Sequence, residues 1–229
     1  MKALFINGSP RRNRNTFKML DSAMKGAAEA GAEVELVHLY DSSFKGCISC
    51  LACKTKNAKT NGLCAFKDPL TPVLEKAHDA DIVVIGSPIY FSYPTGSVRS
   101  FLERFMYPIL SYGMDKDEET GEPKKPLMPK TKATAMIYTM GDIKENTDKI
   151  GYPVILGENE RFLKQLFGYS ETLCSHQHLI VFDFKGYSDD EMFGGADSTW
   201  KKQMEEQSKK DLESAYELGK RLVHIAAEQ

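Results

Sequence analysis

The sequence contains no apolar run long enough to cross a bilayer, and its first residues lead into a short apolar segment instead of a signal peptide. Acidic and basic residues nearly balance at a formal net charge of −2, so the charge pattern of a nucleic-acid-binding protein is missing. The five cysteines are an odd number, and three of them fall within seven residues, unlike a secreted disulfide framework. We therefore expect no membrane partner, no nucleic-acid partner and a cytoplasmic location.

Two common phosphate-binding motifs are also missing. The chain has no G-x-x-x-x-G-K-S/T segment, which argues against a P-loop nucleotidase, and no G-x-G-x-x-G segment, which argues against a dinucleotide-binding Rossmann site. The segment that does suit an anion begins with an apolar run, Ala3 to Ile6, typical of a buried parallel strand. A polar loop follows, and apolar residues then return at helical spacing. Asn15 or Thr16 is expected to cap this helix.

The loop between this strand and this helix contains three arginines, Arg11, Arg12 and Arg14. At the start of a helix the first backbone N–H groups have no partner within the helix, and the helix dipole favours negative charge. The dipole contributes only about 0.3–1 kcal/mol, whereas each hydrogen bond to a charged group adds roughly 1.5–3 kcal/mol. Arg11 is the best candidate to bind a phosphate, because its planar guanidinium can meet two oxygens at once. The alternative interpretation is a solvated basic turn.

Strand and helix patterns alternate along the rest of the chain. The later strands are expected at residues 34–39, 81–86, 133–139 and 179–184. Such alternation predicts a single α/β domain over residues 1–229, with a parallel sheet and helices on both faces. Two segments exceed a minimal domain of this kind, a cysteine-rich excursion at 46–66 and an insertion at 107–130. We expect the insertion to pack against a second subunit or to cover the active site.

The segment after the third strand is expected to face the arginine loop, because ligands bind beyond the carboxyl ends of the strands in an open α/β sheet. This segment contains Pro88, Ile89, Tyr90 and Phe91, and Thr95 begins the next helix. Two aromatic rings beside a proline offer a flat wall for a heterocycle. Burial of one ring face of ~150 Å² is worth about 4 kcal/mol before entropic losses. Alternatively, Tyr90 and Phe91 are core aromatics, although the tip of a loop is rarely buried.

These two loops resemble those of a known family. Gly8-Ser9-Pro10-Arg11 followed by Asn15-Thr16 resembles the first loop of the NAD(P)H-dependent FMN reductase family, whose pattern is G-S-P-R-x-x-S-N-T. Arg14 stands where that family usually has serine. Ser-Pro-Ile-Tyr-Phe at 87–91, Thr-Gly at 95–96 and Phe-Leu-Glu-Arg-Phe at 101–105 resemble its second flavin-binding segment. The resemblance covers roughly residues 1–142.

The resemblance implies a flavodoxin-like, doubly wound, five-stranded parallel sheet of order 2-1-3-4-5 that binds FMN. The FMN phosphate is then expected to contact five residues of the first loop: Ser9, Arg11, Arg14, Asn15 and Thr16. The isoalloxazine ring is expected to lie against Pro88, Ile89, Tyr90 and Phe91. Position and family resemblance together predict a third contact after the fourth strand, at Thr139, Met140 and Gly141.

The cysteines of the excursion are Cys47, Cys50, Cys53 and Cys64, which gives the spacing C-x2-C-x2-C-x10-C. Thiolates at such spacing can hold an iron–sulfur cluster, and the first three match the compact run of ferredoxins. The pattern also resembles the iron-sulfur flavoproteins of the same fold, which implies a 4Fe-4S cluster beside FMN, although the last gap is longer here. Zinc in a closed tetrahedral site and reduced thiols without a metal are the alternatives. Cys174, in or next to a strand, is expected to be an inert core residue.

The sequence therefore predicts an FMN-dependent oxidoreductase. Electrons would come from NAD(P)H or a small reduced redox protein and leave through the flavin to a flavin, a quinone or another small-molecule acceptor. No catalytic side chain is expected, because the flavin itself supplies the chemistry. The alternatives are a flavodoxin-like electron carrier, with or without a cluster, and a protein that binds another phosphorylated ligand. Long helices and the insertion favour a homodimer or homotetramer.

Overall fold

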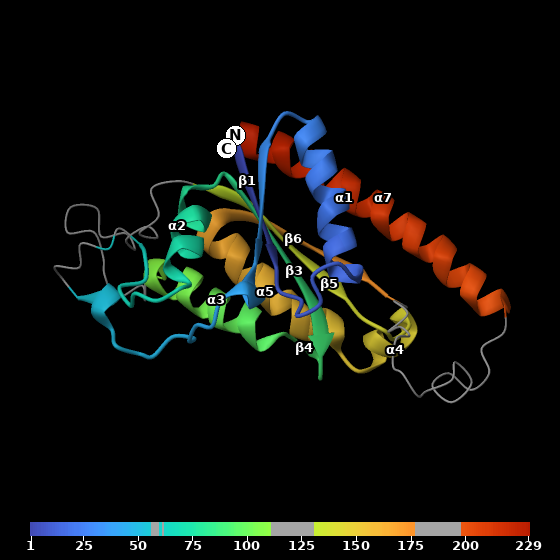
Figure 1. Cartoon of the computed structure of the whole chain (residues 1–229), viewed down its shortest axis with the longest axis horizontal. Coiled ribbons are helices and arrows are strands. Elements are labelled where there is room, and N and C mark those ends of the chain that lie inside the picture. The colour runs from blue at the N-terminus through green and yellow to red at the C-terminus, as the bar shows by residue number, and fades with distance from the viewer. Residues whose placement is uncertain (56–59, 61, 111–130, 177–197) are drawn as a thin grey trace.

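The computed structural model describes residues 1–55, 60, 62–110, 131–176 and 198–229, and for residues 198–204 it describes the backbone only. A sheet of parallel strands forms the centre of the molecule (Figure 1). Its strands are β1 (Lys2–Asn7), β2 (Glu33–His38), β3 (Ile82–Tyr90), β5 (Lys132–Thr139) and β6 (Gly168–Ser175). They pair in the order β2-β1-β3-β5-β6, and every pair is parallel. Counted along the chain, this is the predicted flavodoxin-like order 2-1-3-4-5. A further short strand in the described residues, β4 (Tyr93–Pro94), pairs antiparallel with the end of β3 and was not predicted.

The position of the last parallel strand in the sequence differs from the prediction. Residues 179–184, where this strand was expected, lie outside the described residues, and the position next to β5 is taken by β6. The sequence of β6, GYSETLCS, mixes polar and apolar residues and so lacks the continuous apolar run of a central parallel strand. β6 stands at the end of the strand order, where such a mixed sequence is tolerated.

Helices cover both faces of the sheet, as predicted (Figure 1). The helices are α1 (Asn15–Glu29), α2 (Thr71–Asp79), α3 (Gly96–Met106), α4 (Lys144–Lys149), α5 (Tyr152–Phe167) and α7 (Ser198–Glu228). Alternate residues of β1 point to opposite faces: Leu4 and Ile6 join the core beneath α2, α3 and α5, whereas Ala3 and Phe5 join the core beneath α1 and α7. None of the helices in the described ranges is long and apolar enough to cross a membrane.

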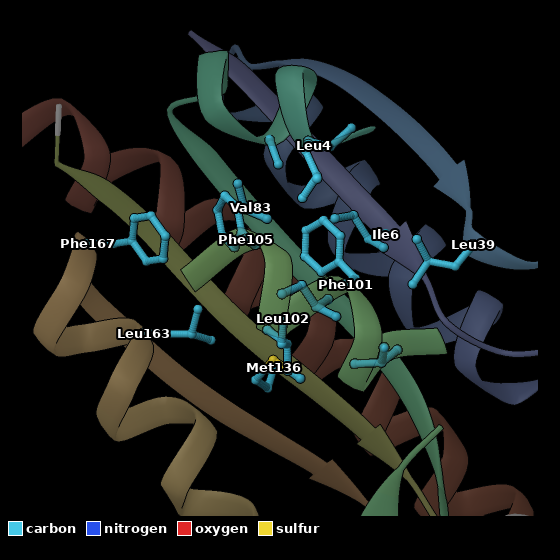
Figure 2. Packing of buried hydrophobic residues seen from close by; sticks show 14 of the residues in the cluster. Leu4, Ile6, Leu39, Val83, Phe101, Leu102, Phe105, Met136, Leu163 and Phe167 are labelled. Atoms are coloured by element: carbon cyan, nitrogen blue, oxygen red, sulfur yellow. The ribbon is translucent and has the colours of Figure 1, made fainter. Parts of the chain in front are cut away.

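Three stacked phenylalanines fix α3 against α5 in the first of these cores, which Figure 2 shows. Phe105 lies 5.2 Å from Phe101 and 4.6 Å from Phe167, measured between ring centroids. Aromatic pairs at such separations contribute about 0.5–1.5 kcal/mol each beyond the area that they bury. Phe101 and Phe105 are four residues apart and so share one face of α3. This packing holds the helix that follows the second predicted loop.

Candidate functional site

The first loop is folded around the side chain of Asn7, the last residue of β1, which is fully buried. Asn7 Oδ1 accepts a hydrogen bond from the Ser9 N–H at 2.9 Å, and Nδ2 donates to the Arg12 carbonyl at 3.3 Å. The hydroxyl of Ser9 accepts from the Arg11 N–H at 3.1 Å. Arg11, Arg12 and Arg14 are exposed. The loop is therefore closed by its own polar groups, while its three arginines face solvent.

The start of α1 differs from the prediction. Arg14 is the N-cap residue, its side chain makes no capping hydrogen bond, and Asn15 is already the first residue of the helix. Thr16 does not cap the helix either, because its buried hydroxyl bonds to the Thr139 hydroxyl at 2.8 Å. The expected cap at Asn15 or Thr16 is thus wrong. A helix start without a side-chain cap leaves its first backbone N–H groups suited to an anion.

A second layer of polar contacts lies behind this loop. Nδ2 of Asn7 lies 3.1 Å from Nδ1 of His38, so the amide donates and the imidazole nitrogen accepts. Burial lowers the pKa of His38, the charge of Arg12 lowers it further, and Asp41 opposes both. Arg12 is itself paired with Asp41 at 2.5 Å. Arg12 therefore already has a carboxylate partner.

The second loop is a β-hairpin. β3 continues through Pro88 and Ile89 to Tyr90, which pairs with Tyr93 of β4. The two residues of the turn, Phe91 and Ser92, have φ values of 49° and 71°. Positive φ at both central residues is the geometry of a type I′ turn, which is usually formed by Asn and Gly. The strand was predicted to end at Gly86, and the sequence offered no signal for a hairpin with Phe at its tip.

The aromatic residues of this hairpin are not core residues. Phe91 is 97% exposed, and Tyr90 and Tyr93 are 48% and 49% exposed. Pro88 and Ile89, by contrast, are half-buried against the body of the protein. The guanidinium of Arg99 lies 5.2 Å from the centre of the Tyr93 ring. The interpretation of Tyr90 and Phe91 as core aromatics is therefore excluded, and both rings are accessible at the edge of the sheet.

The first two loops are joined directly to one another. The Gly8 N–H donates to the Gly86 carbonyl at 2.8 Å, and the Thr95 hydroxyl donates to the Gly8 carbonyl at 2.8 Å. The Thr95 N–H donates to the Ser87 hydroxyl at 3.0 Å, and all these groups are buried. A side chain at Gly8 would clash, since a Cβ there would lie 2.0 Å from Val98 Cγ2. Thr95 was predicted to begin a helix, and its hydroxyl does accept from the Val98 N–H at 3.4 Å. Its hydrogen bond to the Gly8 carbonyl in the first loop was not predicted.

The third predicted segment lies at the same edge. Thr139 ends β5, and its hydroxyl meets Thr16 across 123 positions of sequence. Met140 has a buried side chain, and its N–H donates to the Ser175 carbonyl at 3.0 Å, while Gly141 is exposed. The structure therefore brings the three predicted segments together at the carboxyl ends of β1, β3 and β5. Sequence reasoning missed the buried hydrogen bonds by which Asn7, Ser87 and Thr95 shape and join these loops.

The four cysteines of the excursion line one pocket, which we call the cysteine pocket, together with Glu103 and Arg104 from the end of α3 and Tyr107 directly after it. Cys53 is buried, Cys64 is half-buried, and Cys47 and Cys50 are exposed. Burial raises the pKa of Cys53, while the neighbouring Lys54 lowers it. Among the described residues, no three Cys, His, Asp or Glu side chains lie close enough to hold one metal ion. The four thiols share a pocket, but the exposed thiols of Cys47 and Cys50 would have to approach Cys53 and Cys64 before a metal could bind all four.

The backbone of this segment is unusual as well. Ser49 and Leu51 have φ values of 54° and 56°, and Leu51 is followed by a short 3-10 helix, η2 (Ala52–Lys54). A left-handed residue next to a right-handed one directs successive N–H groups into a concavity, a geometry found at many iron–sulfur sites. The fifth cysteine is separate. Burial raises the pKa of Cys174 in β6 to about 11, as expected for an unreactive thiol.

The doubly wound parallel sheet, with its loops gathered at the carboxyl edge, defines a flavodoxin-like protein. The chain belongs to the NADPH-dependent FMN reductase family, whose model matches residues 1–142 of its 229 residues.

Curated relatives match a little under half of the chain. An iron-sulfur flavoprotein of Archaeoglobus fulgidus is 41% identical over 104 residues, which are 45% of this chain and 48% of that protein. An iron-sulfur flavoprotein of Methanocaldococcus jannaschii is 34% identical over 104 residues, which are 45% of this chain and 51% of the relative. The chain thus spans about half the length of the curated relatives that it matches.

Solved structures resemble the whole chain at low sequence identity. An NAD(P)H:quinone oxidoreductase from Methanothermobacter marburgensis has a TM-score of 0.61 at 16% identity, over 97% of this chain and 98% of that one. An azoreductase from Bacillus anthracis has a TM-score of 0.63 at 14% identity, over 96% of this chain and 99% of its own. At these identities the similarity concerns the fold.

Proposed function

We propose that this protein is an FMN-dependent oxidoreductase whose flavin lies at the carboxyl edge of the sheet. The main support is that three segments far apart in the sequence are joined there by hydrogen bonds, through Gly8, Gly86, Thr95, Thr16 and Thr139. One of these segments is cationic, one is aromatic, and the first begins a helix without a side-chain cap. Such a combination suits a ligand with a phosphate at one end and a flat ring at the other.

The phosphate would be held by the first loop, through Ser9, Arg11, Arg14, Asn15 and Thr16. The Ser9 hydroxyl accepts from the Arg11 N–H, so its own proton can be donated to a phosphate oxygen. Arg11 is exposed and close to the start of α1, where its guanidinium can pair with a dianion. Thr16 would act through its backbone N–H, because its hydroxyl bonds to Thr139.

The isoalloxazine ring would lie against Pro88, Ile89, Tyr90 and Phe91 of the hairpin, with Thr139, Met140 and Gly141 on a neighbouring side. The half-buried Pro88 and Ile89 supply a fixed apolar base, and the exposed Tyr90 and Phe91 supply ring surface. When bound, FMN supplies hydride and electron transfer, so the chain contributes binding, orientation and hydrogen bonds. We infer NAD(P)H or a small reduced redox protein as the donor and a flavin, quinone or similar small molecule as the acceptor. The match to the NADPH-dependent FMN reductase family supports a nicotinamide donor and a flavin acceptor.

We further infer that Cys47, Cys50, Cys53 and Cys64 hold a 4Fe-4S cluster. Their common pocket, the thiolate donor set and the names of the curated relatives support this assignment. An anaerobic ultraviolet–visible spectrum with iron and sulfide analysis tests both cofactors together. Flavin bands without iron or sulfide would support the proposed FMN site and contradict the proposed cluster. Steady-state oxidation of NADPH with added FMN or quinone then separates an enzyme from an electron carrier, which would show no turnover.

The most direct test of the phosphate anchor is Arg11→Ala, compared with Arg12→Ala as the matched control. Loss of a charged hydrogen bond of roughly 1.5–3 kcal/mol weakens FMN binding about 10- to 150-fold. Arg12 is already paired with Asp41, so its removal weakens binding less than about fivefold. Affinity is measured by quenching of FMN fluorescence. Equal affinities for Arg11→Ala and the wild type would show that the anchor lies elsewhere.

A further inference from the structure

Arg104, on the last turn of α3, fastens both ends of the cysteine-containing segment. Its side chain has no exposed surface. Nη1 donates to the Lys45 carbonyl at 3.0 Å, and Nη2 donates to the Phe66 carbonyl at 2.7 Å. These two carbonyls stand immediately before and at the end of the excursion 46–66, which contains all four cysteines of the pocket. One guanidinium therefore closes the base of the whole loop.

The carboxylate of Asp68 completes this closure. Nη1 of Arg104 bonds to Asp68 Oδ2 at 2.6 Å, and the same oxygen lies 3.4 Å from the Lys45 N–H. The Phe66 ring lies 5.0 Å from the guanidinium carbon. Since the pair is almost wholly removed from water, its geometry is held far more firmly than that of a surface ion pair.

Glu103, the residue before Arg104 on α3, holds the backbone of Cys47, the first cysteine of the motif. Glu103 Oε2 accepts a hydrogen bond from the Cys47 N–H at 3.0 Å. On the other side of the loop, Cys64 lies beside the guanidinium of Arg104. The first and last cysteines of the motif are thus both placed by the end of α3. The segment between these two cysteines contains the positive-φ residues Ser49 and Leu51.

One donor of Arg104 is left over. Its Nε–H is buried and has no hydrogen-bond partner within the described part of the chain. A buried donor without an acceptor costs about 1–3 kcal/mol, and Arg104 lines the cysteine pocket. The sulfur of Cys64 is already beside the guanidinium, and a small shift of this sulfur or of another thiolate in the pocket would supply the missing acceptor. Hydrogen bonds to ligand sulfurs are also among the features that tune metal–thiolate centres.

We propose that Arg104 is a positioning residue for a metal–thiolate centre: it holds Cys47 and Cys64 toward one another, and its Nε–H donates to a sulfur of the bound centre. This inference rests on the proposed cluster site, and it concerns residues outside the four ligands. Residues of this kind orient ligands that would otherwise be too mobile to meet at one ion. Their loss typically weakens metal binding by about 10- to 100-fold.

The test is an anaerobic titration of the reduced, full-length protein with Co²⁺, which gives a thiolate-to-cobalt charge-transfer absorption. Arg104→Gln is expected to bind Co²⁺ about 10- to 100-fold more weakly, with less absorption per cobalt because fewer thiolates reach the ion. Arg104→Lys keeps the charge but loses the fork and the Nε–H, and is expected to fall between Arg104→Gln and the wild type. Arg161→Gln is the control, because Arg161 forms an exposed pair with Glu158 at 2.7 Å on α5.

Binding of FMN, measured in the same samples, reports whether each variant is folded and is expected to change less than about twofold relative to the Arg161→Gln control. Equal cobalt affinity and equal absorption per cobalt in Arg104→Gln and the wild type would overturn the role of Arg104. A lower melting temperature with unchanged absorption per cobalt would do the same, since a purely structural residue gives that result. Failure of the wild type to bind Co²⁺, or to take up iron and sulfide, would instead remove the cluster site itself.

A second variant keeps the test decisive if Arg104→Gln does not fold. Asp68→Asn keeps an oxygen for the Leu70 N–H, which Asp68 Oδ1 accepts at 2.9 Å, but removes the charge that orients Arg104. It is expected to weaken cobalt binding severalfold in the same direction as Arg104→Lys. Wild-type affinity in both of these variants would contradict the proposal.

Discussion

The two candidate cofactor sites lie at opposite ends of α3 and are built in different ways (Figure 1). At its start, Thr95 is bonded to the first loop, and nine residues later, about 13 Å along the helix axis, Arg104 holds the cysteine segment. The flavin loops are joined by backbone groups and buried hydroxyls at strand ends, so the register of the sheet sets their positions. The cysteine segment is held by side chains of one helix end. We infer that the proposed flavin site exists before its ligand binds, whereas the proposed cluster site would be completed only when a metal binds.

The largest difference in stability between the two regions is expected when one glycine in each, Gly8 or Gly46, is replaced by alanine. Gly8→Ala would place Cβ 2.0 Å from Val98 Cγ2 and 2.9 Å from the Gly86 carbonyl oxygen. We expect the free energy of unfolding to fall by about 1–3 kcal/mol and FMN binding to weaken, because the first loop must move away from the second. Chemical denaturation and fluorescence titration measure the two effects.

Gly46→Ala is the matched change at the cysteine segment. Its Cβ would meet Glu103 Oε2 at 2.6 Å and the Ser100 hydroxyl at 3.2 Å. Both are ends of side chains, and Glu103 can turn away if it gives up its exposed hydrogen bond to the Cys47 N–H. The free energy of unfolding is therefore expected to fall by no more than about 0.5–1 kcal/mol. Equal destabilisation by both changes would mean that the two regions are equally rigid, and the contrast between them would fail.

A smaller effect of opposite sign is expected at the hairpin. Phe91 is 97% exposed and has a positive φ, a conformation that costs a non-glycine residue about 1–2 kcal/mol. Phe91→Gly removes this strain, so the free energy of unfolding should rise by about 0.5–1 kcal/mol after the added freedom of glycine in the unfolded chain. FMN affinity should fall by about fivefold or more, because ring stacking is lost.

Ser92→Gly separates strain from stacking in this prediction. Ser92 also has a positive φ but has no ring, so glycine there should raise stability without weakening FMN binding. Loss of FMN affinity in Ser92→Gly, or retention of full affinity in Phe91→Gly, would contradict the contact between the hairpin and the flavin.

The smallest effect is expected from pH. Burial lowers the pKa of His38 in the folded protein, whereas the unfolded chain titrates near the ordinary value of about 6.5. Below that pH the unfolded state takes up a proton more readily, so stability falls as the pH decreases and is unaffected well above it. His38→Gln can accept from Asn7 without titrating. The wild type should therefore lose more melting temperature than His38→Gln between about pH 8 and about pH 5.5. Parallel pH profiles would show that His38 does not control the loop.

The alternation of strands and helices and the position of the first two loops could be predicted from local sequence, because each loop follows an apolar run and a recognisable break. The strand order and the third contact were predicted with the help of the family resemblance. Residues that act over long sequence distances could not be predicted. Arg104 meets carbonyls 59 and 38 positions away, and no pattern near it announces them. The hairpin at Phe91 was missed because its turn lacks Asn and Gly, and the helix start at Arg14 was missed because Thr16 bonds to Thr139 instead. The edge strand β6 was missed because half of its residues are polar.

The hydrogen bonds of Arg104 to both ends of the cysteine-containing segment also affect how much the length of this segment can vary. Both ends of the cysteine-containing segment are secured at one point, so the number of residues between those ends is nearly free of constraint from the sheet. Doubling the length of a loop closed in this way costs only about 0.6 kcal/mol. We therefore expect the ten-residue gap between Cys53 and Cys64 to cost little stability, and a segment of another length to be tolerated between the same two points of attachment.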